Sequence, residues 1–156
     1  MRFTLIKDLS KDTSMRPILT GLLIFTLIYI LTDFIVKYFN FGVFPQAISL
    51  SLFGDEEQFI DPLSQASFLE FWHMEIFFMM MLLLTLSAVF IRLAKNNNSK
   101  LLILNILMAS AILSLITLFL AYYVSSIFVV GYSILYILWH LTAIYMIIYS
   151  LWKLSL

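Results

Sequence analysis

Four long apolar segments dominate the pattern of hydrophobic and polar positions along this chain. They cover residues 17–36, 68–91, 101–123 and 132–151. A helix needs about 20 apolar residues to cross a hydrocarbon layer of roughly 30 Å. Because lipid offers the backbone no hydrogen-bond partners, each segment must be a helix or part of a closed barrel, and continuous apolarity without strict alternation excludes the barrel.

The pattern therefore predicts an all-α fold, an integral membrane four-helix bundle. We expect one domain over residues 1–156, with helices at about 17–37, 65–93, 100–123 and 131–153. The connections between the last three helices are short, so these helices should be sequential antiparallel neighbours.

Composition agrees with a membrane protein and excludes several kinds of chemistry. The chain is 63% hydrophobic and only 12% charged, with a mean hydropathy of +1.03, which lies outside the range of soluble domains. The lipid bilayer is thus the first partner, and no nucleic-acid partner is expected. Since the chain contains no cysteine, disulfides, iron–sulfur clusters and c-type haem attachment are excluded.

The distribution of charge predicts the orientation. If the chain crosses four times, eight of the nine basic residues fall on the side of the termini, and only Lys37 falls on the other. The positive-inside rule then places both termini in the cytoplasm, and we expect a multi-pass protein of a bacterial inner membrane. We expect no cleavable signal peptide, because the first apolar segment is long and follows a mixed-charge leader.

The long connection after the first helix contains an amphipathic patch, Pro45 to Phe53, between two glycines. This patch predicts a short interfacial helix in the outer loop between helices 1 and 2, with Ile48, Leu50 and Phe53 directed into lipid or onto the bundle.

Polar and small residues in membrane helices tend to face the bundle interior. Helical spacing assigns each long helix one inward stripe. The predicted stripes are Thr26, Tyr29, Asp33 and Lys37; Glu70, His73, Phe77, Met80, Leu84 and Ser87; Ser110, Ser114, Thr117 and Ala121; and Ser133, Tyr136, His140, Ala143, Ile147 and Ser150. Asp33 and Lys37 are four residues apart, the spacing of an ion pair on one helix, here near the outer boundary.

The two histidines, His73 and His140, are the main candidates for cofactor chemistry. Histidines on facing helices of a bundle commonly serve as axial ligands of a b-type haem, and Tyr136 is among the aromatic residues that would line the slot. By helical rise, His73 lies about 28 Å from the cytoplasmic end and His140 about 20 Å. Met80, at about 18 Å, is therefore the alternative ligand opposite His140.

The two glutamates beside His73 have different expected roles. Glu70 shares a helix face with His73 and is interpreted as a capping carboxylate, in a Ser67–Glu70 capping box, or as a partner that orients the imidazole. Glu75 lies about 200° around the helix from His73, so we expect it to face another surface.

Three functions follow from these candidates. The first is a small b-type cytochrome-like electron-transfer subunit that holds one haem b between helices 2 and 4, with a redox partner and possible quinone contact. The alternative is a non-catalytic accessory or assembly subunit of a larger, respiratory-type membrane complex, in which the histidines form interhelical hydrogen bonds. The third is a small proton or solute conduit through Asp33, Glu70, His73 and His140. We expect an electron-transfer or accessory subunit rather than a stand-alone enzyme.

Overall fold

The protein is a bundle of long helices, as the apolar segments predict. The computed structural model describes residues 14–94 and 98–155. Its helices are α1 (Met15–Asn40), α2 (Pro45–Phe53), α3 (Gln65–Leu93), α4 (Asn98–Tyr123) and α5 (Phe128–Ser155). Over the described ranges the chain forms no strand, apart from an isolated bridge between Asp55 and Ile60. The predicted all-α four-helix bundle is confirmed.

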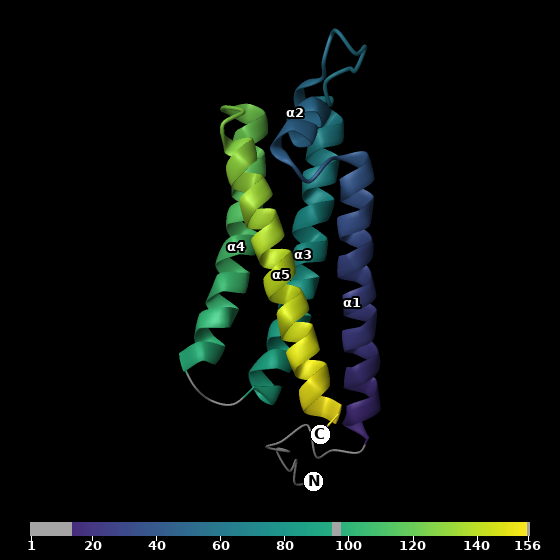
Figure 1. Ribbon diagram of the computed structural model, residues 1–156, viewed down its shortest axis with the longest axis vertical. Helices are drawn as coiled ribbons and strands as arrows, with labels where there is room; N and C mark the ends of the chain where they lie inside the picture. The colour runs from purple at the N-terminus through teal and green to yellow at the C-terminus, as the bar shows by residue number, and fades with distance from the viewer. Residues whose placement is uncertain (1–13, 95–97, 156) are drawn as a thin grey trace.

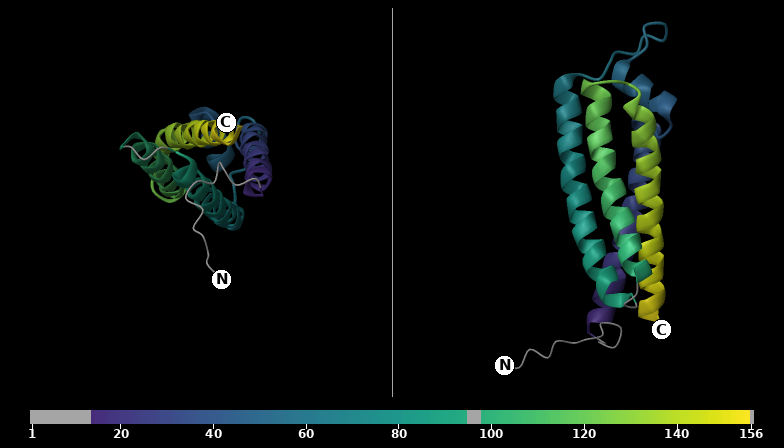
Figure 2. Two further views of the ribbon diagram at one scale, coloured as in Figure 1. Left: turned by 90° about the horizontal axis from the view of Figure 1, so that it is seen from below. Right: turned by 90° about the vertical axis from the view of Figure 1, so that its left-hand side faces the viewer.

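The four long helices run alternately up and down, and α5 is the helix that binds the others together (Figure 1). It packs against α1, α3 and α4, and it also touches α2. Seen along the bundle axis, the long helices form a ring (Figure 2). The start of α1 and the end of α5 lie at one end, which we call the terminal end, and α2 lies at the opposite end, which we call the α2 end (Figure 1). Residues 1–13 of the predicted leader, and residues 95–97 of the predicted cytoplasmic turn, lie outside the described residues.

The four long helices are each long and apolar enough to cross a membrane. Large apolar side chains cover their outward faces, including Phe25 on α1, Ile134 and Leu141 on α5 and Leu84 on α3. In water such a surface would be unstable, whereas lipid tails solvate it. The chain is therefore a multi-pass integral membrane protein.

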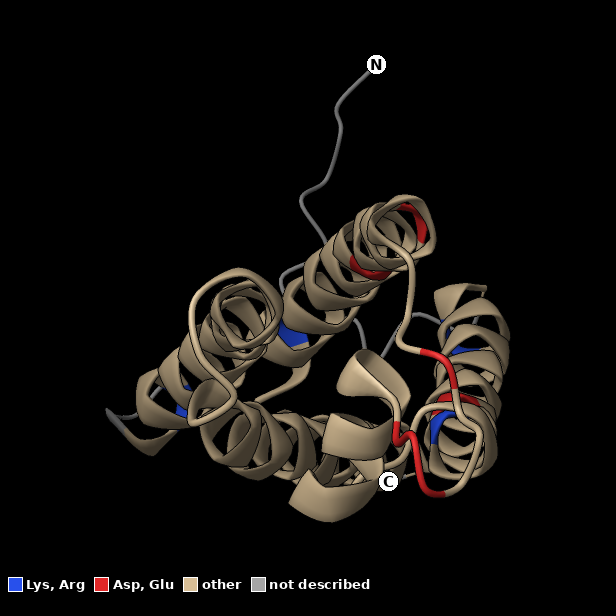
Figure 3. Ribbon diagram, turned by 90° about the horizontal axis from the view of Figure 1, so that it is seen from above, with Lys and Arg blue, Asp and Glu red and all other residues tan. Residues whose placement is uncertain are grey.

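The predicted short helix is present as α2, with the predicted bounds. Ile48 and Leu52 are buried against the bundle, Leu50 is half-buried and Phe53 is exposed. The Ser133 hydroxyl of α5 donates a hydrogen bond of 2.6 Å to the Val43 carbonyl just before α2, and the Leu63 amide donates to the carbonyl of Leu52, near the end of α2. These contacts hold α2 across the end of the bundle (Figure 3). Its position at the membrane surface stays a prediction.

Gly42 makes the sharp turn from α1 into α2. Its φ of +88° is in the left-handed region, and a Cβ placed there would lie 2.5 Å from the Ala47 Cβ. The Gly42 amide donates to the Lys37 carbonyl and so closes the end of α1. The sequence of this turn therefore fixes how α2 sits on the bundle.

Gly42→Ala should lower the free energy of unfolding by about 1–3 kcal/mol, because alanine meets both a strained φ and a clash. Gly21→Ala is the matched control: Gly21 lies within α1 and an added Cβ would meet nothing within 4 Å. It should leave stability unchanged or raise it by up to about 1 kcal/mol. Denaturant unfolding in mixed micelles, followed by circular dichroism, measures both, and equal effects would contradict the assigned role of Gly42.

Candidate functional site: a buried charge cluster

Four ionisable side chains from three helices meet inside the bundle toward the α2 end. They are Asp33 and Lys37 of α1, Glu75 of α3 and His140 of α5. We call these four residues the charge cluster. Buried charges in a protein interior are stable only when they are paired and hydrogen-bonded.

Lys37 is the cation at the centre of this cluster. Its Nζ atom lies 2.5 Å from Glu75 Oε2 and 3.4 Å from Asp33 Oδ2. The ammonium also lies 4.8 Å from the ring centroid of Tyr136, which adds a cation–π contact. Although it is a lysine, Lys37 is only 4% exposed. The predicted Asp33–Lys37 pair is therefore present, but it is buried and extended by Glu75 rather than snorkelling at the boundary.

His140 connects the same Asp33 carboxylate to α5. Its Nε2 atom lies 3.2 Å from Asp33 Oδ2, and its Nδ1 atom lies 2.9 Å from the Tyr136 carbonyl one turn earlier. The Tyr136 hydroxyl donates to the same Asp33 oxygen over 3.2 Å. With 2% of its surface exposed, His140 is enclosed, and protein oxygens lie against both of its ring nitrogens.

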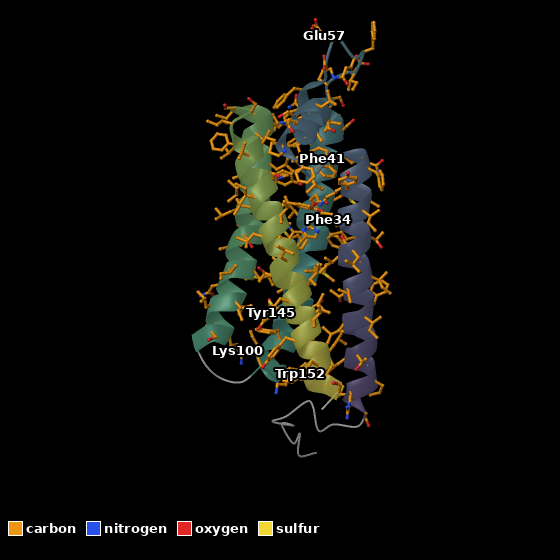
Figure 4. All side chains as sticks on the ribbon, viewed as in Figure 1. Phe34, Phe41, Glu57, Lys100, Tyr145 and Trp152 are labelled. Carbon is orange, nitrogen blue, oxygen red and sulfur yellow. The ribbon has the colours of Figure 1, made fainter. Side chains whose placement is uncertain are left out.

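Aromatic rings surround the cluster. Phe41 stacks on Phe71 with ring centroids 4.9 Å apart, and Tyr132 lies one turn from Tyr136 on α5. Phe34 packs edge-on against the His140 ring, and Figure 4 shows Phe34 and Phe41 at successive levels below α2. This apolar wall lowers the local dielectric, so charge–charge interactions within the cluster are strong.

A small cavity touches the cluster. Its volume is about 10 Å³, and its lining includes both Asp33 and Glu75 together with Tyr29 and Trp139. Trp139 is 2% exposed, and its Nε1–H has no hydrogen-bond partner within the described part of the chain. A cavity of this size has room for about one water molecule.

Three of the four predicted inward stripes agree with the structure. Thr26 and Lys37 of α1 are buried, with Tyr29 and Asp33 half-buried between them. On α4, Ser110, Ser114 and Ala121 are buried, and every residue of the α5 stripe is buried. The stripe of α3 is wrong. Five of its six residues, Glu70, His73, Phe77, Met80 and Leu84, are exposed, and only Ser87 is half-buried. The neighbouring Met79, Leu82 and Leu86 fill the interior instead.

The structure consequently does not bring the predicted ligands together. His140 and Tyr136 are buried at the cluster, whereas His73 and Glu70 face outward from α3 and Met80 is 47% exposed. Glu75 faces a different surface from His73, as its position on the helix predicts, but that surface is the bundle interior, where Glu75 pairs with Lys37. It is the member of the cluster that sequence reasoning missed.

The predicted capping box at the start of α3 is also wrong. Ser64 is the N-cap residue, and its hydroxyl accepts a hydrogen bond of 3.2 Å from the Ser67 amide. Ser67 lies inside the helix, so Glu70 is one turn too late to act as a cap. The reason is local, since Ser64 already provides the oxygen that the first free amides require.

Within residues 14–94 and 98–155, no three His, Asp or Glu side chains converge as they would around a metal ion. The charge cluster is instead organised around the Lys37 ammonium, which occupies the place between the carboxylates.

One family of known proteins matches the chain. The model of the Aq_1264_TM family, described as a transmembrane helical domain, matches residues 42–156. This range contains α2 to α5 and leaves out α1, which contributes Asp33 and Lys37. No curated protein and no solved structure matches the chain.

Proposed function

We propose that this chain, which belongs to the Aq_1264_TM family of transmembrane helical domains, is a non-catalytic accessory subunit. The description of the family names no activity, so the proposal is argued from the side chains of this chain. In this proposal it assembles with another membrane protein through the outward face of α3. The observation that carries the proposal is the exposure of Glu70 and His73 on a helix that is apolar enough to span a membrane.

Polar side chains on the outside of a membrane helix need partners. Glu70 and His73 are one turn apart on α3 and are followed on the same face by Phe77, Met80 and Leu84, all exposed. Intramembrane Glu and His side chains are rare on lipid-facing surfaces, because lipid cannot satisfy their hydrogen bonds. A second membrane polypeptide with polar groups at the same depth would satisfy them, and the methionine and phenylalanine side chains would pack against it.

Haem b between His73 and His140 remains a prediction that this arrangement does not favour. An axial ligand needs a free imidazole nitrogen, yet both nitrogens of His140 lie at hydrogen-bond distance from protein oxygens. His73 and the alternative ligand Met80 face away from the bundle interior. The residues present thus do not form an axial-ligand pair, and His140 fits the alternative role of an interhelical hydrogen-bonding group. The redox partner and the quinone contact were predicted together with the haem, and they also remain predictions.

The orientation of the chain in the membrane is also part of this proposal. Arg16 of α1, Arg92 of α3, Lys100 of α4 and Lys153 of α5 lie in the turns of their helices nearest the terminal end. The acidic loop that follows α2 lies at the opposite end (Figure 3), and Glu57 is at its tip (Figure 4). By the positive-inside rule, the terminal end faces the cytoplasm and the α2 end faces outward.

A photoreactive benzophenone side chain placed at position 73 should form a discrete adduct with another membrane polypeptide in native membranes. The same side chain at position 141 is the control, because Leu141 is also exposed but lies on α5. We expect no discrete protein adduct from position 141. Glu70→Leu should weaken the adduct at position 73 by removing the neighbouring carboxylate from the contact.

Two results would overturn the proposal. The first is an adduct at position 73 that contains only lipid or only a second copy of this chain. The second is a Soret band in the purified wild-type protein that is lost in His140→Leu, because that would establish haem ligation.

A further inference from the structure

The hydrogen bonds of His140 cannot all form around a neutral imidazole beside an ionised Asp33. The Tyr136 carbonyl is only an acceptor, so the Nδ1 atom at 2.9 Å must carry a hydrogen and donate it. A neutral ring then has a bare Nε2, which would face Asp33 Oδ2 at 3.2 Å as one acceptor facing another. A proton between these two atoms removes the conflict.

The net charge of the cluster independently indicates a proton between Asp33 and His140. Asp33 and Glu75 carry two negative charges when ionised, and Lys37 carries one positive charge. One further positive charge makes the cluster neutral, and His140 is the fourth ionisable member. An unbalanced charge is expensive in this aromatic-walled interior.

We infer that Asp33 and His140 form a proton-binding site, in which His140 is an imidazolium paired with the Asp33 carboxylate and the charge of the cluster holds the proton. The carboxylate is the better place for the negative charge, because the Tyr136 hydroxyl donates to it and the Lys37 ammonium lies 3.4 Å from it. The site goes beyond the accessory role, since it does not depend on what α3 binds.

Few other ionisable groups lie near the Asp33–His140 pair on the described helices. Beyond the cluster itself, Tyr29 of α1 lines the adjoining cavity, and Tyr132 and Tyr136 of α5 lie beside His140. Helix α2 contains no ionisable side chain, and those of α4 (Lys100, Tyr122 and Tyr123) lie near its two ends.

The cavity beside the cluster offers the proton a route of exchange. A water molecule there would lie against Asp33 and Glu75 and would accept the hydrogen bond that Trp139 Nε1–H lacks among the described residues. Once the proton has passed from Asp33 through this water and out of the site, the cluster keeps one net negative charge and two acceptors face each other between α1 and α5. Proton release should therefore loosen α1 from α5, which couples the proton to helix packing.

The test uses nitrogen-15 NMR of the full chain, labelled at histidine and held in lipid nanodiscs. The chain contains two histidines, so His73→Gln leaves the signals of His140 alone. At neutral pH we expect both ring nitrogens of His140 to carry a hydrogen. Asp33→Asn should remove the imidazolium and leave a neutral ring that is protonated at Nδ1 only.

Glu75→Gln separates a charge-held proton from a purely local hydrogen bond. No direct contact joins Glu75 to His140 in the cluster as described, yet removing its charge should lower the proton affinity of His140 about tenfold or more. Glu57→Gln, which removes a carboxylate from the exposed loop, is the control and should have no effect. Circular dichroism checks that each variant remains helical. A neutral His140 in the wild-type background, or an unchanged affinity in Glu75→Gln, would overturn the inference.

Discussion

Replacing Lys37 with methionine should lower the free energy of unfolding by about 3–5 kcal/mol, the range for breaking a buried ion pair from one side. Methionine fills much of the same space, but it leaves the Glu75 and Asp33 carboxylates without the cation that separates them. Lys153→Met is the matched control, because Lys153 lies near the end of α5 with its ammonium over the Trp152 ring. We expect the control to change stability by less than about 1 kcal/mol.

A double variant identifies the cause of the loss. If stranded charge destabilises Lys37→Met, then Lys37→Met with Glu75→Gln should recover part of the lost stability, because the second change removes one unpaired carboxylate. Reversible denaturation in mixed micelles, followed by circular dichroism, measures the three free energies. Additive losses in the double variant would show instead that Lys37 acts by packing alone.

The number of helices and most of their inward faces could be predicted from the sequence. The α1, α4 and α5 stripes are correct because their residues recur over three or more helical turns, for example from Thr26 to Lys37 and from Ser133 to Ser150. Over such a length, helical spacing leaves little freedom in the choice of face. Burial of these residues follows from the preference of polar groups for a protein interior over lipid.

The inward face of α3 could not be predicted in this way. Its polar residues are concentrated in the first turns, where Glu70 and His73 lie near the end of a helix longer than the bilayer requires. A polar residue on the outward face in that position can be satisfied by a partner subunit instead of by the bundle interior. Residues 76–84, in the middle of α3, are apolar on all sides, so this part of the helix does not indicate which face points inward.

The rotation of α3 is instead determined by a contact between distant parts of the chain. Glu75 pairs with Lys37, which is 38 residues earlier. One signal in the sequence could have indicated this pairing. Counted at 1.5 Å per residue from Arg92 and from Arg16, Glu75 and Asp33 both lie about 26 Å from the terminal end. Two carboxylates at one depth, with a single lysine one turn away, favour a shared ion pair over two separate polar contacts.

The charge cluster also explains why α1 stays attached to the bundle. Much of the α1 surface is exposed apolar side chain, and its buried positions are few: Leu23, Thr26, Ile30 and Lys37. Apolar packing gains little over lipid in a membrane, because lipid tails are as apolar as the helices. The bonds from Asp33 and Lys37 to α3 and α5 therefore supply specific attachment that apolar contact cannot, and they hold α1 in one rotation.

The two histidines should respond very differently to the same substitution, although the sequence predicted a common function for them. His140→Leu should lower the free energy of unfolding by about 3 kcal/mol, because it removes the α5 partner of Asp33 and leaves the cluster with unbalanced negative charge. His73→Leu should change it by no more than about 0.5 kcal/mol in micelles, since His73 is exposed in the isolated chain.

A second substitution tests whether the effect at position 140 arises from charge. Asp33→Asn in the His140→Leu background neutralises the stranded carboxylate while keeping its size, so the double variant should be more stable than His140→Leu alone. Unfolding in mixed micelles gives the comparison directly. If the double variant is less stable by the sum of the two single losses, then His140 stabilises the bundle by its shape and not through Asp33. Equal effects of His73→Leu and His140→Leu would contradict the outward placement of His73 and return both histidines to one site.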